Sequence, residues 1–226
     1  MSNKIKMVVF DMAGTVVNEN NVVYKTVRKA INEAGFDFTL DQVLEQGAGN
    51  EKLQAIKKVL KVYGGVEDTE LAQSIYDNFI VQLADAYRTL DILPQDNAID
   101  LFAALKDKGI LTVLNTGYNR ETAQSLIDKL GWEQGNEFDL MVTATDVKGS
   151  RPKPDMIWFA MEKYGITDAR EVVKVGDSII DIEEGENAGC SMNIGITTGA
   201  HTYEQLQSAN PEHIIDNLME LLPLLN

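Results

Sequence analysis

The chain of 226 residues has little of two residue types that often carry chemistry, cysteine and histidine. Its single cysteine, Cys190, allows no internal disulfide, which agrees with a reducing compartment. Cys190 stands in the segment NAGCSMNIG before an apolar run, and we interpret it as a small buried residue rather than a nucleophile. The histidines are His201 and His213, so metal sites and general bases built on histidine are poorly supplied. Chemistry would therefore have to use carboxylates, lysine or arginine.

Positive charge is also scarce. Twenty basic residues against 35 acidic ones give a formal net charge of -15 at pH 7. This balance argues against nucleic acid or an anionic membrane surface as a partner. It also means that an anionic substrate would need local help from a metal ion or from a few placed cations.

Long hydrophobic runs are missing as well. The apolar runs are too short to cross a bilayer, and the one near the amino terminus is shorter than a signal-peptide core. Because no lipidation motif is evident either, we expect a cytoplasmic protein without a membrane partner. The composition is 44% hydrophobic and 24% charged, which at this length suits one large soluble domain or two modest ones.

The stretch KMVVFDMAGT is the strongest local pattern that is present. The apolar run Met7 to Phe10 stops abruptly at Asp11, and a glycine turn follows at Gly14. This pattern predicts a buried parallel strand, and ligands of open α/β sheets bind beyond the carboxyl ends of such strands. Asp11 therefore stands where chemistry would be placed, although an Asp before Gly also fits an ordinary turn.

The pattern of apolar residues changes near Ile92. Helical spacing fills Val17 to Leu90 without a predicted strand, and Gly47 to Asn50 is predicted to be a flexible break. Strands and helices then alternate, which is typical of a parallel sheet covered on both faces. Helices are predicted at 22–35, 39–46, 51–63, 67–90, 98–108, 121–130, 154–164 and 181–188, and further strands at 111–114, 140–142, 172–175 and 192–196.

These patterns predict an α/β protein with a Rossmann-like parallel sheet, helices on both faces and an inserted all-helical cap. The core comprises residues 1–16 and 94–226, and the cap comprises residues 17–93. The two crossings, near 16–19 and 91–94, would act as hinges.

Four predicted strand ends carry polar or charged side chains: Asp11, Thr116, Arg151 with Lys153, and Asp177 with Asp181. Phosphoryl transfer needs this inventory, because catalysis there consists mostly of positioning and charge neutralisation. We expect Asp11 and Asp177 to hold Mg²⁺, and Asp181 to ligate it or orient its waters.

Substrate binding is assigned to the same edge. Thr116 and backbone N–H groups would donate to phosphoryl oxygens, so Gly14 and Gly117 join Thr116 as substrate-binding residues. A cation, Arg151 or Lys153, would shield the nucleophilic carboxylate from an anionic substrate. Each residue alone has a structural explanation, but four strand ends in order favour a functional site.

With these motifs the chain resembles the haloacid dehalogenase (HAD) superfamily of hydrolases, in the branch with a helical cap after the first strand. DMAGT, NTG, RPKP and GDSIID appear in the family's order over nearly the whole length. The resemblance implies a Rossmann-like core and Mg²⁺-dependent phosphoryl transfer through an aspartyl-phosphate. By this resemblance, Asp11 would be the nucleophile and Thr116 would bind phosphate. The Ala13 carbonyl and the Asp177 carboxylate would be ligands of Mg²⁺, and Asp181 would support these ligands.

Two departures narrow the resemblance. Phosphatases of the superfamily usually carry an Asp general acid at the position of Ala13 and a Lys at the position of Arg151. Both changes resemble the phosphonatases (phosphonoacetaldehyde hydrolases) and their phosphonatase-like relatives, which cleave a C–P bond. In that branch a cap lysine forms an imine with the substrate aldehyde, and the imine accepts the electrons of the departing carbon.

The cap segment AGNEKLQAI resembles the phosphonatase segment and places Lys52 at the position of that lysine. Lys57, Lys58 and Lys61 follow on the same predicted helix, and a solvated face explains most of such a group. The fit is incomplete, because the family has Met at the position of Ala48 and His at the position of Ala55. The missing His puts turnover of phosphonoacetaldehyde itself in question.

Three functions stay open on the sequence. The first is a phosphonatase-like hydrolase that uses Lys52 on a small phosphonate. The second is a phosphatase of a small phosphate monoester such as phosphoglycolate, and the third is a binding module that has lost turnover. Whether C–P or P–O bonds are cleaved is likewise open, and so is the choice between a monomer and a homodimer.

Overall fold

Short apolar runs rich in valine, isoleucine and leucine form the strands, because such residues suit a sheet that is covered on both faces. The computed structural model describes residues 4–225; residues 1–3 and 226, which the prediction places in the core, lie outside the described part. A six-stranded sheet in the order β5-β4-β1-β6-β7-β8 is parallel throughout. Its strands are β1 (Met7–Asp11), β4 (Leu111–Thr116), β5 (Leu140–Thr143), β6 (Val172–Gly176), β7 (Met192–Ile196) and β8 (His213–Ile215).

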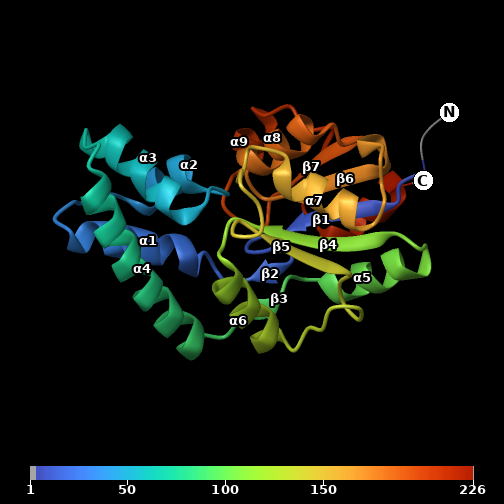
Figure 1. Cartoon of the computed structure of the whole chain (residues 1–226), viewed down its shortest axis with the longest axis horizontal. Coiled ribbons are helices and arrows are strands. Elements are labelled where there is room, and N and C mark those ends of the chain that lie inside the picture. Colours follow the sequence, from blue (N-terminus) through green and yellow to red (C-terminus); the bar gives the residue numbers. More distant parts are fainter. Residues whose placement is uncertain (1–3, 226) are drawn as a thin grey trace.

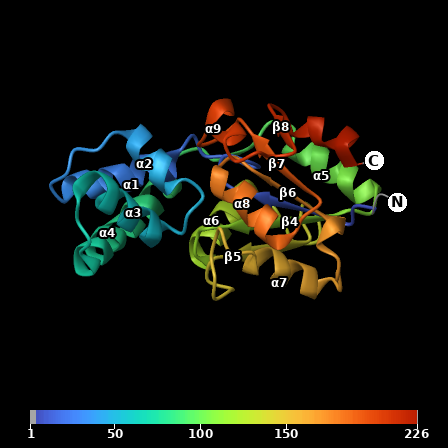
Figure 2. The same cartoon turned by 90° about the horizontal axis from the view of Figure 1, so that it is seen from above.

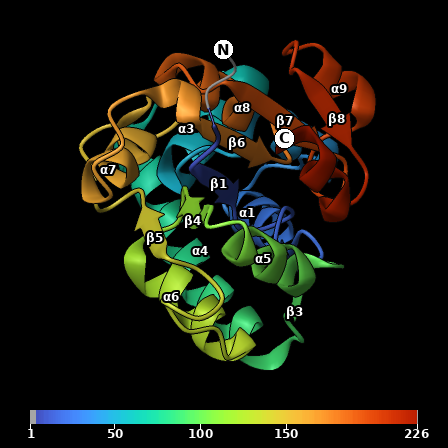
Figure 3. The same ribbon diagram turned by 90° about the vertical axis from the view of Figure 1, so that its right-hand side faces the viewer.

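Strand β1 lies inside the sheet, and its side chains alternate between the two faces. Met7 and Val9 pack with apolar residues of α7 and α8, whereas Val8 and Phe10 pack with those of α5, α6 and η2. Figure 3 shows these two layers on opposite sides of the sheet. The predicted α/β class is therefore confirmed. The covering helices are α5 (Ala98–Asp107), α6 (Arg120–Leu130), α7 (Asp155–Lys163), α8 (Ile179–Ala188) and the 3-10 helix η2 (Leu218–Leu225).

The inserted cap is helical and lies beyond the carboxyl ends of the strands (Figures 1 and 2). Val27, Val59 and Phe79 are fully buried and belong to the apolar cluster that joins its helices. Thr39 is the N-cap of the second helix and forms a capping box with Gln42, and Gly65 ends the third helix in a left-handed conformation. The cap helices are α1 (Val22–Glu33), α2 (Leu40–Gly47), α3 (Lys52–Gly64) and α4 (Thr69–Thr89).

The two crossings between cap and core pair with each other, which the sequence analysis did not predict. Strands β2 (Val17–Asn18) and β3 (Leu93–Pro94) form a two-residue antiparallel ribbon. The prediction of no strand between Val17 and Leu90 is therefore wrong at its first two residues. A two-residue strand is too short to produce a periodic pattern. The domain boundaries proposed at 16/17 and 93/94 pass through this ribbon and stay a prediction.

The segment Gly47 to Asn50 also differs from its prediction, because it is buried rather than a flexible break. A side chain at Gly49 (φ +70°) would overlap Ser178 and Ile180 of the core, so only glycine allows this close approach. The Gly49 N–H donates to the Tyr24 hydroxyl over 2.9 Å. This loop therefore packs the cap against the carboxyl edge of the sheet.

Three smaller features complete the fold. Short helices at Ala169–Glu171 (η1) and Tyr203–Gln207 (α9) were not predicted, because each has too few residues for helical periodicity. Cys190 is partly buried, and burial raises the pKa of its thiol to about 12, which does not suit a nucleophile. None of the helices described within residues 4–225 is long and apolar enough to span a membrane.

Candidate active site

Three carboxylates meet at the carboxyl edge of the sheet. Asp11 ends β1, Asp177 follows the neighbouring strand β6, and Asp181 lies in the first turn of α8. All three are buried, and one oxygen of each lies within 4.8 Å of the others. Parallel pairing of β1 with β6 is what brings residues of such distant sequence positions together.

Arg151 is the cation at the centre of this cluster. Its Nη1 donates to Asp11 Oδ1 over 2.6 Å and lies 2.9 Å from Asp181 Oδ1. Its Nε donates to Glu184 Oε2 over 3.0 Å, and its Nη2 donates to the backbone and side-chain oxygens of Asn115 over 2.8 and 2.6 Å. All these contacts use the planar fork of a guanidinium, which an ammonium group cannot reproduce.

Lys174, Glu184 and Asn115 complete the cluster and were missed by the sequence analysis. Lys174 Nζ donates to Asn115 Oδ1 and lies 2.9 Å from Asp181 Oδ1. Glu184 accepts both hydrogen bonds of the Asn115 amide, at 3.0 and 2.9 Å. The signals were available: Lys174 interrupts an apolar strand, and Glu184 follows Asp181 by three residues, on the same helical face.

The charges of the cluster differ from one carboxylate to the next. Burial tends to raise the pKa of Asp181, but the Arg151 and Lys174 cations lower it. Burial and the neighbouring Asp11 and Asp181 carboxylates raise the pKa of Asp177 well above its usual value. Within residues 4–225, no basic side chain forms an ion pair with Asp177; it accepts from the Thr15 hydroxyl and, over 2.6 Å, from the Ala200 N–H. Asp177 is thus the carboxylate that lacks a cation.

A divalent cation fits this arrangement. Carboxylate oxygens are the ligands that Mg²⁺ prefers, and Asp177 lies beside Asp11 without a cation of its own in the described part of the chain. A Cβ at Gly14 or at Gly199 would overlap the Asp177 side chain, so glycine at both positions allows this carboxylate to lie between the two backbone segments. The chemistry of the donors and the missing cation therefore agree with a magnesium site.

Some of the other predicted site residues lie near the carboxylate cluster, and one of them, Lys153, does not. Thr116 ends β4 and is buried, and its hydroxyl accepts from the Tyr118 N–H over 3.2 Å. Gly117 lies against the cap, since an added Cβ would stand 3.0 Å from the Asn50 carbonyl oxygen. Ala13 is half-buried in the turn after Asp11, next to Gly14. Lys153, in contrast, is exposed outside the buried cluster.

Lys52 lies on the cap side of the site and is only 6% exposed. Its Nζ donates to the Asn50 carbonyl over 2.7 Å and lies over two aromatic rings, 5.0 Å from the centre of Tyr24 and 5.2 Å from that of Tyr118. Burial lowers its pKa to about 8, although the nearby Asp11 carboxylate opposes the shift. Its place as the first residue of α3 also disfavours positive charge.

A further buried carboxylate, that of Glu19, lies near Lys52. The sequence analysis did not predict it. Glu19 stands between β2 and α1, where its Oε2 accepts from the Val23 N–H over 2.8 Å and from the Tyr87 hydroxyl over 3.1 Å. The Tyr87 hydroxyl is 2.9 Å from that of Tyr118. No sequence pattern links Glu19 with Tyr87, because 68 residues separate them.

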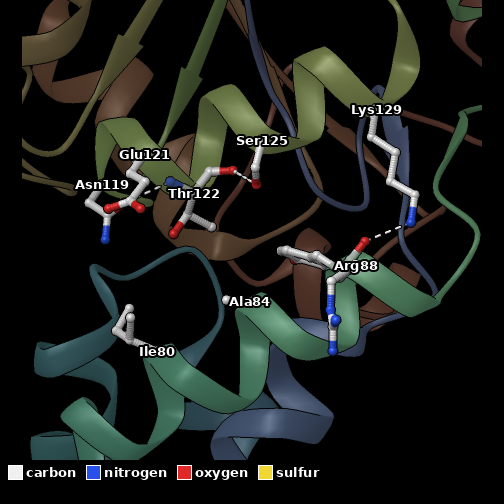
Figure 4. A pocket seen from close by; sticks show the side chains of 9 residues that line it. Ile80, Ala84, Arg88, Asn119, Glu121, Thr122, Ser125 and Lys129 are labelled. Atoms are coloured by element: carbon white, nitrogen blue, oxygen red, sulfur yellow. Dashed lines mark hydrogen bonds between the residues drawn. The ribbon is translucent and has the colours of Figure 1, made fainter.

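A pocket of about 320 Å³ opens between α4 of the cap and α6 of the core. Figure 4 shows Ser125 and Lys129 of α6 facing Ala84 and Arg88 of α4, with the Lys129 amine reaching across. Lys129 Nζ donates to the backbone carbonyls of Tyr87, over 2.6 Å, and Leu90. The pocket shares Ile80, Asn119 and Thr122 with a smaller cavity lined by Lys52 and Tyr118. The interface between cap and core therefore leads toward Lys52.

Comparison with known proteins gives consistent matches. Residues 8–194 match the family model of the haloacid dehalogenase-like hydrolases. A phosphonoacetaldehyde hydrolase from Vibrio campbellii is 31% identical, over 93% of this chain and 83% of its own length.

Two solved structures share the fold. A phosphonoacetaldehyde hydrolase-like protein from Oleispira antarctica has a TM-score of 0.83 at 21% identity, covering 99% of this chain and 92% of its own. A predicted phosphoglycolate phosphatase from Haemophilus somnus has a TM-score of 0.82 at 18% identity, with 99% of both chains covered. At these identities the structures establish the parallel core with its helical cap, and nothing about substrate.

Proposed function

Because the chain belongs to the haloacid dehalogenase-like hydrolases, we propose that it hydrolyses a small aldehyde phosphonate, with Mg²⁺ and an aspartyl-phosphate intermediate. The phosphonoacetaldehyde hydrolases among its relatives suggest phosphonoacetaldehyde or a close analogue as substrate. The products would be inorganic phosphate and the corresponding aldehyde.

The observation that carries this proposal is the setting of Lys52. An amine must be neutral to attack a carbonyl carbon, and the pKa of Lys52 is lowered to about 8 by burial. The Tyr24 and Tyr118 rings hold its Nζ on the cap side of Asp11, and they also tolerate the positive charge of a protonated imine. A surface lysine of the same helix, Lys61, instead extends into solvent and pairs with the exposed Glu67 carboxylate.

The core residues would perform the phosphoryl transfer. One Asp11 oxygen attacks phosphorus, while Arg151 holds the other and reduces its repulsion of the anionic substrate. Thr116 and the Gly117 backbone would position the phosphoryl oxygens. Lys153 is exposed, so it has no direct role in substrate binding in this proposal.

The metal would be held by the carboxylates of Asp11 and Asp177 and the carbonyl of Ala13, with Asp181 supporting the site. When bound, Mg²⁺ would neutralise charge on the phosphoryl oxygens and on the attacking carboxylate. When Lys52 is the neutral amine that the reaction needs, four buried carboxylates (Asp11, Asp177, Asp181, Glu184) face two buried cations, Arg151 and Lys174. A divalent ion would offset this net negative charge, which favours the approach of a phosphonate dianion.

The proposed cleavage balances in electrons and atoms. Lys52 and the aldehyde condense to a protonated imine and release water. The C–P bond then breaks, its electron pair moves toward the imine nitrogen, and the phosphoryl group passes to Asp11, leaving an enamine on Lys52. Water hydrolyses the acyl phosphate, and a proton added to the enamine carbon restores an imine, which a further water hydrolyses to free the product aldehyde.

A phosphatase acting on a small monoester, such as phosphoglycolate, is the second candidate. The observation that favours it is Ala55, which occupies the position where the resemblance places a proton-transferring His. Such an enzyme would need no imine, but it would have to protonate the leaving oxygen without an acid at Ala13.

Phosphate release with Mg²⁺ from phosphonoacetaldehyde and from a panel of small phosphate esters separates the two candidates. We expect release from the phosphonate that borohydride abolishes only in the presence of substrate, with the adduct mapped to Lys52 by mass spectrometry. Lys52→Met should then abolish phosphonate cleavage, whereas Lys61→Met, which removes only an exposed ion pair with Glu67, should not change it. Release from esters alone, undiminished in Lys52→Met, would favour the phosphatase. The cytoplasmic location and the choice between monomer and homodimer stay predictions of the sequence.

A further inference from the structure

Glu19 is a buried acid for which the mechanism above has no use. Only 2% of it is exposed, and the Val23 N–H holds its carboxylate at the start of α1. A neutral glutamine would serve as well in that structural role, because a single N–H needs a single acceptor. The ionisable group itself is therefore unexplained by packing.

A chain of hydroxyl groups leads from this acid toward Lys52. Glu19 Oε2 is 3.1 Å from the Tyr87 hydroxyl, which is 2.9 Å from the Tyr118 hydroxyl. The Tyr118 ring is one of the two rings against the Lys52 amine. Since all these groups are buried, no bulk water competes with the chain.

Two other carboxylates of the described residues, Asp11 and Glu51, also act on Lys52, but the mechanism uses Asp11 on phosphorus and Glu51 caps α3 through the N–H groups of Leu53 and Gln54. Ala55, three residues after Lys52, is fully buried with its Cβ facing Gly47, so the helix face there is filled by packing. His201 accepts from the Ile179 N–H at the start of α8, and His213 is exposed on β8. The acid that the imine chemistry needs must come from another element.

We propose that Glu19, acting through the hydroxyls of Tyr87 and Tyr118, supplies the proton that expels water when Lys52 condenses with the substrate aldehyde. The inference rests on the proposed imine chemistry of Lys52. Glu19 does not touch the substrate, so it is a positioning residue that acts through Tyr118.

The direction of the hydrogen bonds changes with the proton on Glu19. With Glu19 ionised, Tyr87 donates to it and Tyr118 donates to Tyr87. With Glu19 protonated, the acid donates to Tyr87, Tyr87 donates to Tyr118, and the Tyr118 O–H is released to donate to another acceptor. The Lys52 amine lies 5.2 Å from the centre of the same ring, so a substrate bound to Lys52 is the acceptor that the proposal requires.

The step then balances. The carbinolamine hydroxyl takes a proton from Tyr118 and leaves as water, each hydroxyl is refilled by its neighbour, and Glu19 becomes a carboxylate. The nitrogen lone pair forms the C=N bond of the protonated imine. Hydrolysis of the imine after C–P cleavage runs the same path backwards and returns the proton to Glu19.

The charged and titratable groups around Glu19 agree with this role. Tyr87 hydrogen-bonds it from α4, and the cations Lys52 and Lys25 face it from α3 and α1. Burial raises the pKa of Glu19 to about 7, against the opposing effect of these neighbours. The active form has one proton shared between Glu19 and Lys52, so imine formation should rise with pH near 7 and fall near 8.

The test compares wild type with Glu19→Gln, Tyr87→Phe and the double variant, over pH 6 to 9. Formation of the borohydride-trapped adduct with phosphonoacetaldehyde is measured by mass spectrometry, and hydrolysis of p-nitrophenyl phosphate reports the Asp11 centre. We expect the ratio of the two rates to fall about 100-fold in each single variant, and no further in the double variant. In both single variants, the decrease in imine formation above pH 8 should disappear.

Glu33→Gln is the matched control, because Glu33 also accepts hydrogen bonds from α4, through Asn78 and Gln82, but is exposed. It should keep the wild-type ratio and pH profile. A wild-type profile in Glu19→Gln, with Lys52 still trapped, would overturn the inference and leave the proposed function standing. Failure to trap Lys52 in wild type, while p-nitrophenyl phosphate is hydrolysed, would overturn both.

Discussion

Arg151 donates from Nη1 to Asp11 Oδ1 over 2.6 Å, although the two residues are 140 positions apart in the chain. The same guanidinium contacts Asp181, Glu184 and Asn115, so a single side chain orients the Asp11 carboxylate and joins α8 to β4. In the proposed mechanism, this residue would therefore contribute both to stability and to the orientation of Asp11.

Removing this cation should destabilise the fold. Arg151→Met leaves Asp11 and Glu184 buried without their main cation, so we expect the free energy of unfolding to fall by about 3–5 kcal/mol. Urea unfolding followed by circular dichroism measures this loss. Arg170→Met breaks an exposed ion pair with Asp168 and should change nothing measurable. Equal stability of the two variants would contradict the central role of Arg151.

Removal of the metal should abolish turnover, and Asp177 should set its affinity. We expect EDTA to stop phosphate release, and Mg²⁺ to raise the melting temperature of the wild-type protein. In Asp177→Asn, the Mg²⁺ concentration for half-maximal stabilisation should rise at least about 10-fold. Glu183→Gln, at an exposed position of the following helix α8, is the control. A melting temperature that ignores Mg²⁺ would argue against the site.

Glu19 should make stability depend on pH. Its pKa is raised from the usual 4.5 to about 7 by burial, so the folded protein binds this proton more tightly than the unfolded chain. The stabilising contribution is complete below pH 4.5 and is lost as pH rises through 7. Between pH 4.5 and 8, wild type should lose about 3 kcal/mol relative to Glu19→Gln in urea unfolding. Parallel curves for the two proteins would show that Glu19 titrates normally.

Ala13→Asp should separate ester from phosphonate chemistry. The position lies two residues after Asp11 and is half-buried, so a carboxyl there has room to reach a leaving oxygen. We expect hydrolysis of small phosphate monoesters to rise about 100-fold, whereas phosphonate cleavage gains nothing because carbon leaves as an enamine. Steady-state phosphate release on both substrates measures the difference. A parallel gain on the phosphonate would mean that its leaving group needs a direct acid.

Ala55→His should not restore the histidine of related enzymes. Ala55 is fully buried, and a Cβ added at Gly47 would lie 3.3 Å from its own Cβ, so an imidazole would overfill the contact between α2 and α3. We expect a loss of about 1–3 kcal/mol in unfolding free energy and no gain in imine formation. Ala55→Ser is the small control. Faster trapping of Lys52 in Ala55→His would show that the histidine position is still functional here.

Much of the site could be predicted because parallel strands end at one edge. Asp11, Thr116, Arg151 and Asp177 each follow an apolar run, and runs of that kind predict strands whose ends converge. The geometry that gathers them is a property of the sheet, so local patterns suffice. Their roles as nucleophile, ligands and cation nevertheless stay a prediction.

The rest of the site depends on contacts that no local pattern encodes. Glu19 meets Tyr87 only because α1 packs against α4, and the burial of Lys52 depends on tyrosines from two other segments. Lys153 is exposed although it follows Arg151 by only two residues in the motif, so closeness in sequence does not bring its side chain inward. The positions of these three side chains are set by tertiary packing.

The pairing of β2 with β3 determines how the cap is attached to the core. Val17 pairs with Pro94 and Asn18 with Leu93, so the chain leaves the core and re-enters it at neighbouring points. The entire cap occupies what is, for the core, a single hairpin connection. All six strands of the main sheet lie outside this connection, with β1 leading into it, so the order of the sheet does not depend on what the connection contains. The segment that carries Lys52 is therefore attached to the core as an insertion between two neighbouring points of the chain.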